Sequence, residues 1–423
     1  MSDDAHDKAF FRQSGWLMIS GIMSGILMMG VHLLSKKIPT AEYGTVVKML
    51  AVTIIIPTMP LQMVFARETA AALALGKNRP LAGLIQKTVL IMSGLWLMAA
   101  LVGLAFQQSI LMHWNVAQAS ALWLLMLVVW ASLVAPVFMG TLQGAQNFPW
   151  LGGVMILNGG VRLAGAALLV FCFTGTAAGV MTGVLAGVGA SVLLGVWQTR
   201  RLWAATAEAF AWRPLLKQAI PLLIGFSAYQ FLFSADTIFV GGFFSGDETG
   251  YYGAAGTLAR ALIWLVAPLA TVMFPKLVQS TAKAQRNNLL GLTLLGTAIL
   301  GLGGALGLVL VGPLVVKMVF TSNYVAAVTR IIPWYAGAMI PLSLANVLVN
   351  NLLARSDFRV VPWLALLAIG YTIVLNAWHP SLTAVLQCMA GFNAITFLIC
   401  SLYTWGPLAK KYQISLAQLP LAE

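Results

Sequence analysis

The chain has 423 residues, of which 60% are hydrophobic and only 8% are charged, and its formal net charge is +13. A soluble domain carries about 25% charged residues, so this composition excludes a soluble globular protein and indicates a polytopic membrane protein. The basic residues lie in short segments between apolar runs and form no single patch, which excludes nucleic acid as a partner.

Twelve apolar segments are long enough for membrane helices, each of which needs about 20 residues to cross the hydrocarbon. In chain order they cover residues 15–35, 45–66, 86–106, 119–140, 150–173, 177–197, 217–241, 252–274, 289–313, 327–352, 361–377 and 382–404. No small-residue cleavage site follows the first run, so we expect it to be a retained span. Prolines interrupt several spans and are expected to bend them, namely Pro57, Pro60, Pro268 and Pro341.

The loop charges predict the orientation of these spans. With the N-terminus placed in the cytoplasm, seventeen lysines and arginines fall on the cytoplasmic side and four on the opposite side. Cytoplasmic loops carry the excess of basic residues, so we expect both termini to be cytoplasmic. Aromatic residues near the span ends are typical of interfacial anchors, namely Trp16, Trp150, Tyr251 and Tyr252.

The second half of the chain repeats landmarks of the first. EYGTVVKMLAVTIIIPTMPLQMVFAR at 42–67 aligns with YYGAAGTLARALIWLVAPLATVMFPK at 251–276, with Gly44 on Gly253 and Phe65 on Phe274. Further along, QNF at 146–148 aligns with SDF at 356–358.

This repeat predicts two six-helix lobes, an N-terminal one at 1–205 and a C-terminal one at 206–423. Because six spans are an even number, both lobes enter the membrane in the same direction, as in a parallel transporter repeat. The substrate site is then expected in a central cavity between the lobes.

No pattern in the sequence indicates a metal, a cofactor or an enzyme. The three cysteines lie in apolar runs without CxxC spacing, and the four histidines are scattered. No loop carries an acid pair, or a nucleophile with a base. We therefore expect neither catalytic activity nor a bound metal or cofactor.

Four charged residues fall inside the predicted spans: Lys48, Arg162, Asp236 and Arg260. A charge at the bilayer centre is costly and usually faces a cavity or a partner. At about 1.5 Å per residue, Arg260 lies roughly 12 Å below the outer face and Arg162 roughly 18 Å above the inner face. Lys48 is only roughly 6 Å deep by the same measure, which is shallow enough for its side chain to reach the outer interface.

Two interpretations of these charges are open. Asp236 lies at a depth similar to that of Arg260, so the two could form a structural ion pair. Three cations against one anion still leave a positive surplus inside the membrane, and that surplus favours an anionic ligand.

Two segments resemble the polysaccharide-biosynthesis transporters. LLSKKIPTAEYGTVVKML at 33–50, followed by FARETA at 65–70, is similar to the family's leucine-rich first span, its E-Y-G turn and the end of its second span. SADTIFVGGFFSGDETGYYGAAGTLAR at 234–260 resembles the family's seventh and eighth spans. This family includes the O-antigen flippases and belongs to the multidrug/oligosaccharidyl-lipid/polysaccharide (MOP) flippase superfamily.

The resemblance implies a twelve-helix flippase of the bacterial inner membrane. Its substrate would be an undecaprenyl-pyrophosphate-linked oligosaccharide, moved from the cytoplasmic to the periplasmic leaflet by alternating access. Membrane lipid, a glycan polymerase and glycosyltransferases are the other partners that it implies.

A pyrophosphate suits arginine forks, so the candidate head-group residues are Arg260, Arg162 and Lys48. We expect Asp236 to orient Arg260 in the empty site and to release it to the phosphate. Polar residues within spans are candidate sugar contacts, namely Gln62, Asn158, Tyr229, Gln230, Asn346 and Asn350.

Other functions remain as alternatives. A cation-coupled multidrug or metabolite antiporter of the same superfamily would need buried carboxylates, but the first span has none and Asp236 is the only acid within a span. A positively charged interior suits an exported cation poorly. A relative of the peptidoglycan-precursor flippases would usually have more spans. A scaffold of a glycan-assembly complex would need larger polar loops than this chain has.

Overall fold

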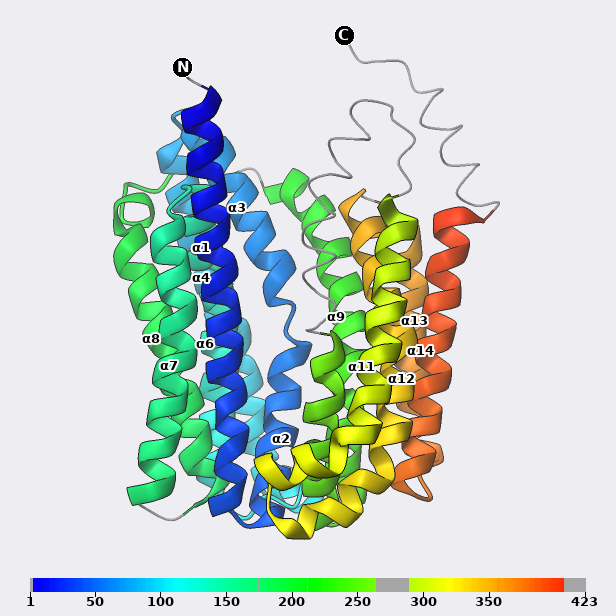
Figure 1. Ribbon diagram of the computed structural model, residues 1–423. Helices are drawn as coiled ribbons and strands as arrows, with labels where there is room; N and C mark the ends of the chain where they lie inside the picture. Colours follow the sequence, from blue (N-terminus) through cyan, green and yellow to red (C-terminus); the bar gives the residue numbers. More distant parts are fainter. Residues whose placement is uncertain (1–2, 173–174, 211, 264–288, 356, 407–423) are drawn as a thin grey trace. The chain divides into compact units, whose positions relative to one another are not determined.

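A computed structural model describes residues 3–172, 175–210, 212–263, 289–355 and 357–406. All regular elements within these ranges are helices (Figure 1). The first half contains α1 (Asp3–Gly30), η1 (Val31–Lys37), α2 (Thr40–Ile55), α3 (Thr58–Ala74), α4 (Asn78–Ala105), α5 (Gln107–His113), α6 (Ala119–Gly144), α7 (Phe148–Cys172) and α8 (Ala177–Trp203). The second half contains α9 (Trp212–Phe243), a helix described over 246–263, α11 (Leu289–Val319), α12 (Ser322–Ala354), η2 (Phe358–Val360), α13 (Val361–Ala377) and α14 (Leu382–Trp405).

Eleven segments of the described chain are long and apolar enough to cross a membrane. They correspond to eleven of the predicted spans, and the prediction of an all-α polytopic membrane protein is confirmed. The remaining predicted span, 252–274, begins in the helix described over 246–263. Its later part lies outside the described residues, and so do the repeat landmark Phe274 and the predicted bend at Pro268.

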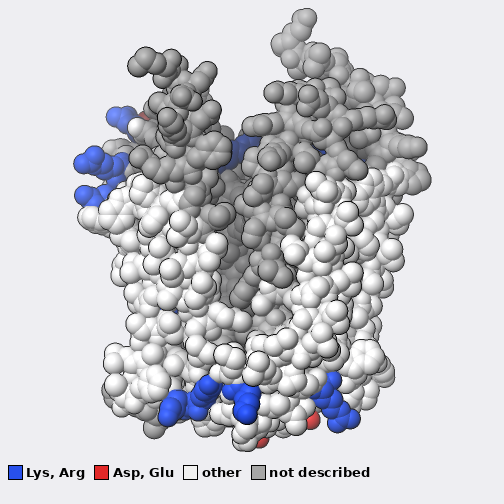
Figure 2. Space-filling model, in the orientation of Figure 1, with Lys and Arg blue, Asp and Glu red and all other residues white. Residues whose placement is uncertain are grey.

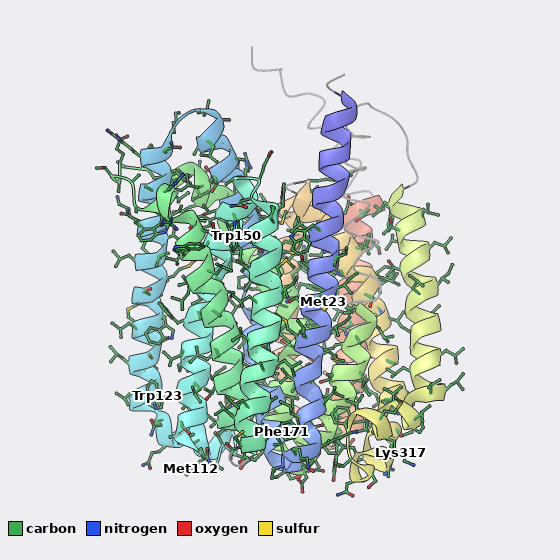
Figure 3. The ribbon with its side chains drawn as sticks, turned by 60° about the vertical axis from the view of Figure 1, so that its left-hand side comes forward. Met23, Met112, Trp123, Trp150, Phe171 and Lys317 are labelled. Atoms are coloured by element: carbon green, nitrogen blue, oxygen red, sulfur yellow. The ribbon has the colours of Figure 1, made fainter. Side chains whose placement is uncertain are left out.

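Large apolar side chains cover the outer faces of these helices. Leu90 on α4 and Leu310 on α11 are 72% and 71% exposed. Met23 of α1 and Phe171 of α7, labelled in Figure 3, are 44% and 63% exposed. On the face drawn in Figure 2, the Lys and Arg of the described residues gather near the helix ends, and the described surface between these ends is almost entirely uncharged. This distribution suits helices whose middle sections contact lipid.

The chain divides into two compact units. The first unit contains Met1–Ala219 with Ser245–Gly250, and the second contains Ile220–Phe244 with Tyr251–Glu423. In the first unit α1 packs on α7, α7 on α8, α8 on α6 and α6 on α3. In the second unit α12 packs against both α11 and α14, and α13 packs on α14.

Proline breaks the second span of the first unit. Helix α2 ends at Ile55 and α3 begins at Thr58, so the helix is interrupted next to Pro57, as predicted. Proline has no amide hydrogen to continue the helical ladder, and its ring crowds the preceding turn. Pro341, in contrast, lies inside the continuous helix α12.

The E-Y-G segment at 42–44 lies inside helix α2, near its N-terminus, and not in a turn as expected. The Glu42 carboxylate accepts a hydrogen bond of 2.6 Å from the backbone N–H of Ala177, the first residue of α8. A carboxylate is favourable there because helix N-termini carry unpaired N–H groups and a partial positive charge. The Tyr43 hydroxyl lies 2.8 Å from Nδ1 of His32 in η1. The E-Y-G segment therefore connects α2 to both α8 and η1.

Gly44, the third residue of this segment, allows a close backbone approach. A methyl group added at Gly44 would lie 2.8 Å from the backbone nitrogen of Gly250 and 3.1 Å from Cβ of Thr249. These residues belong to the same unit. Only glycine fits here without displacing backbone, which gives a packing reason for this part of the motif.

Candidate functional site

Asp236 of α9 and Arg260 of the following helix form a buried ion pair. Nη2 of Arg260 lies 2.7 Å from Oδ1 and 3.0 Å from Oδ2 of the carboxylate. The Arg260 side chain is 9% exposed, and the Asp236 side chain is 0% exposed. The structure therefore contains the ion pair that the similar depths of the two residues suggested.

Two tyrosines complete the coordination of the carboxylate. The Tyr252 hydroxyl donates to Oδ2 of Asp236 at 2.9 Å, and the Tyr335 hydroxyl of α12 donates to the same oxygen. The carboxylate thus accepts from three side chains of the second unit: Tyr252 and Arg260 lie on the helix that follows α9, and Tyr335 lies on α12. A buried charge is tolerated when its hydrogen-bonding capacity is filled in this way.

Arg260 is also held by neutral groups. Its Nη2 donates to the Thr237 hydroxyl at 2.9 Å, and its Nε donates to the Phe233 carbonyl at 3.0 Å. The guanidinium lies 5.4 Å from the ring centres of both Phe233 and Tyr335. Among the described residues, only its third nitrogen, Nη1, has no hydrogen-bond acceptor.

The prediction that Tyr252 is an interfacial anchor was wrong. Its side chain is completely buried and its ring packs at a centroid distance of 5.1 Å from that of Tyr335. The physical reason is the carboxylate of Asp236, which needs hydroxyl donors inside the apolar unit. Tyr335 and Thr237 also contact this pair, and no pattern in the sequence marks them, although Thr237 directly follows Asp236.

Lys48 is buried within the first unit. Lys48 is only 2% exposed, and its ammonium donates to the backbone carbonyl of Trp114. Trp114 follows the last residue of α5, where helix carbonyls lack intrahelical partners. Lys48 therefore binds a helix C-terminus, a favourable place for a cation.

Arg162 differs from the other two cations. It lies in the middle of α7, is partly exposed, and makes no hydrogen bond or ion pair to any residue that the structure describes. Its Nε is enclosed without an acceptor. One turn earlier, Oδ1 of Asn158 is enclosed without a donor. His32 of η1 is close enough to interact electrostatically with the guanidinium.

Several of the predicted sugar contacts lie within hydrogen-bonding distance of other protein groups. Nε2 of Gln62 donates to Oε1 of Gln143 at 2.9 Å, and Nδ2 of Asn350 donates to Oδ1 of Asn346 at 2.8 Å. Tyr229 is buried, and its hydroxyl lies 3.5 Å from the carbonyl of Leu342.

The candidate residues are distributed over both units. Lys48, Gln62, Asn158 and Arg162 belong to the first unit, and Tyr229, Gln230, Asp236, Arg260, Asn346 and Asn350 belong to the second. In the described ranges, no three His, Cys, Asp or Glu side chains are grouped as metal ligands would be.

Comparison with known proteins identifies the fold. No protein-family model matches the sequence, and no curated protein sequence matches it either. Solved structures do match. An inward-facing multidrug resistance MATE family transporter of the MOP superfamily is similar with a TM-score of 0.70 and 11% identity, over 94% of this chain and 96% of that one. The lipid II flippase MurJ, in an inward closed conformation, is similar with a TM-score of 0.66 and 15% identity, over 96% and 93%. The chain therefore has the fold shared by these transporters along nearly its whole length.

Proposed function

We propose that this protein is a flippase for lipid-pyrophosphate-linked oligosaccharides, such as an O-antigen repeat unit. It moves them from the cytoplasmic to the periplasmic leaflet of the bacterial inner membrane by alternating access of its two lobes, 1–205 and 206–423. The resemblance of the E-Y-G segment to polysaccharide transporters supports this function. The fold that the chain shares with a lipid II flippase is consistent with a lipid-linked glycan as substrate.

The observation that carries the proposal is the balance of charge within the spans. Asp236 neutralises Arg260. Lys48 donates to a neutral carbonyl, and Arg162 has no carboxylate partner among the described residues. The interior of the spans is thus net positive, and a pyrophosphate would compensate the desolvated cations.

The proposed roles follow from this balance. The three cations supply the positive potential that attracts the head group, with Asp236 as the charge partner of Arg260. The amide and hydroxyl side chains of the spans contact the sugars, and for this role Gln62, Asn158, Tyr229, Gln230, Asn346 and Asn350 are the candidates. A glycan polymerase and glycosyltransferases would act on the same lipid-linked substrate.

Transport into the outer leaflet tests the proposal directly. The full chain is reconstituted in liposomes that contain an undecaprenyl-pyrophosphate-linked oligosaccharide with a fluorescent label on the sugar. The exposure of the label to a membrane-impermeant quencher is followed with time. We expect label that begins on one leaflet to appear on the other faster than in protein-free liposomes. Equal rates with and without the protein would exclude the function.

A cation-coupled multidrug antiporter is the second candidate, and it is favoured by the likeness to a multidrug transporter. Such a mechanism needs a carboxylate that exchanges a proton or a cation. The Asp236 carboxylate is already engaged by Arg260, Tyr252 and Tyr335, so a coupling cation would have to displace an arginine. Efflux of a fluorescent organic cation from cells that produce the protein, above the level of cells without it, would favour this candidate over the flippase.

A further inference from the structure

The three membrane-embedded cations are not equally available to a ligand. Nε and Nη2 of Arg260 are already bonded, and its charge is matched by Asp236. The Lys48 ammonium is bonded to the carbonyl of Trp114. Arg162 has five N–H donors, none of which reaches an acceptor in the described part of the chain.

The cost of recruiting each cation follows from these contacts. An anion that bound Arg260 at the expense of its present bonds would leave the Asp236 carboxylate buried and unpaired, which is strongly unfavourable. An anion that bound Arg162 would displace no group of the described residues. It would also give the enclosed Nε a compensating charge, and an unpaired donor of this kind is expensive to keep.

Arg162 lies where α7 packs closely against α8, next to a second unsatisfied polar group. A methyl group added at Gly187 of α8 would lie 2.6 Å from Cβ of Arg162, so the two helices are in close contact at this level. Asn158 lies one turn earlier on α7, and side chains four residues apart share a helix face. Its enclosed amide oxygen has no donor among the described residues. That oxygen can only accept, so toward a phosphoryl oxygen the amide would act through its NH2 group. A guanidinium and an amide oxygen, neither of which has a hydrogen-bond partner among the described residues, therefore lie together within the first unit.

We propose that Arg162, assisted by the Asn158 amide, is the group that directly contacts the phosphoryl oxygens of the lipid-linked substrate. Arg260 in this assignment does not touch the substrate and serves to hold the second unit together. A guanidinium matches phosphate geometry because it donates two parallel hydrogen bonds. The assignment rests on the proposed function, and it names which cation of the net-positive interior is the binding group.

Binding by the full chain in neutral detergent tests this assignment. The affinities for undecaprenyl pyrophosphate, for phosphatidylglycerol and for uncharged undecaprenol are measured by the ligand-induced shift in melting temperature. We expect the pyrophosphate to bind at least about tenfold more tightly than either of the others. Equal affinity for phosphatidylglycerol would mean that Arg162 meets ordinary anionic lipid, and would overturn the assignment.

Variants then locate the contact. Arg162→Met should lose at least about tenfold in pyrophosphate affinity, and Arg162→Lys should fall between it and the unmodified chain, because lysine keeps the charge without the fork. Asn158→Leu should weaken binding less. The matched control is Arg79→Met, which removes an exposed cation that pairs with Glu208 and should leave the pyrophosphate affinity unchanged.

The melting temperature without ligand separates binding from structure. Arg162 has no hydrogen bond or ion pair to a described residue that the substitution would break, so Arg162→Met should melt at or above the temperature of the unmodified chain. A lower melting temperature with unchanged pyrophosphate affinity would show a structural arginine and overturn the assignment. Should Arg162→Met fail to fold, the Arg162→Lys and Asn158→Leu affinities decide the question.

The outcomes also distinguish this assignment from the proposed function. Binding that depends on Arg162, without transfer between leaflets, would support the site and contradict the flippase. Transfer that is unaffected in Arg162→Met would support the flippase and contradict the site.

Discussion

Arg260 Nη2 lies 2.7 Å from Asp236 Oδ1, and this pair joins α9 to the next helix inside the second unit. The contact explains why a permanently charged guanidinium is tolerated within an apolar stretch. Its charge is balanced by the carboxylate, whose remaining capacity is filled by Tyr252 and Tyr335. The four side chains form one network, in which the loss of any member leaves another buried polar group unsatisfied.

Removing one charge of the pair should be far more harmful than removing both. Arg260→Met or Asp236→Leu alone leaves a buried unpaired charge and should lower the free energy of unfolding by about 3–5 kcal/mol, whereas the double variant leaves none. We expect the yield of monodisperse protein to fall in each single variant and to recover in the double variant. A double variant that folds well but cannot transfer substrate would instead favour direct contact between Arg260 and the head group.

The two tyrosine hydroxyls should each contribute measurably to stability. Tyr252→Phe or Tyr335→Phe removes one donor to the buried carboxylate and should cost about 1–3 kcal/mol. Tyr251→Phe is the matched control, because the hydroxyl of that neighbouring residue makes no hydrogen bond to a described residue. Equal melting temperatures for the Tyr252 and Tyr251 variants would contradict the importance of the network.

The packing of α7 on α8 should make the protein's stability sensitive to substitution at Gly187 and insensitive to substitution at Gly189. A side chain at Gly187 would meet Arg162, whereas nothing lies within 4 Å of the position that a methyl group at Gly189 would take. Gly187→Leu should therefore cost about 1–3 kcal/mol through overpacking, with Gly189→Leu close to neutral. Thermal unfolding of both variants in detergent gives the comparison, and similar losses would argue against the packing described.

The orientation predicted from the loop charges is accessible to labelling. Asp247 and Arg201 are both exposed. With cytoplasmic termini, Asp247→Cys should react with a membrane-impermeant maleimide added outside spheroplasts, and Arg201→Cys should react only after the membrane is opened. A reporter that is active only in the cytoplasm should likewise be active when it is fused after Glu423. Labelling of Arg201→Cys from outside would reverse the topology.

The sequence by itself determined the membrane class, the position of the spans and the break at Pro57. A spanning helix must satisfy its own backbone hydrogen bonds and needs a minimum apolar length, and both requirements are visible in a hydropathy pattern. Counting residues into each span also gave similar depths for Asp236 and Arg260, which is why their pairing was anticipated.

Only the tertiary structure decided which polar groups meet. Lys48 reaches the carbonyl of Trp114, 66 residues away, and Tyr335 reaches Asp236 from a distance of 99 residues in the chain. Hydropathy does not encode such contacts, because lipid and protein interior are equally apolar and a helix may turn either face to its neighbour. For the same reason, hydropathy does not distinguish Arg162 from Arg260. Both are arginines in apolar runs, and helix packing alone gives one a carboxylate and leaves the other without an acceptor in the described chain.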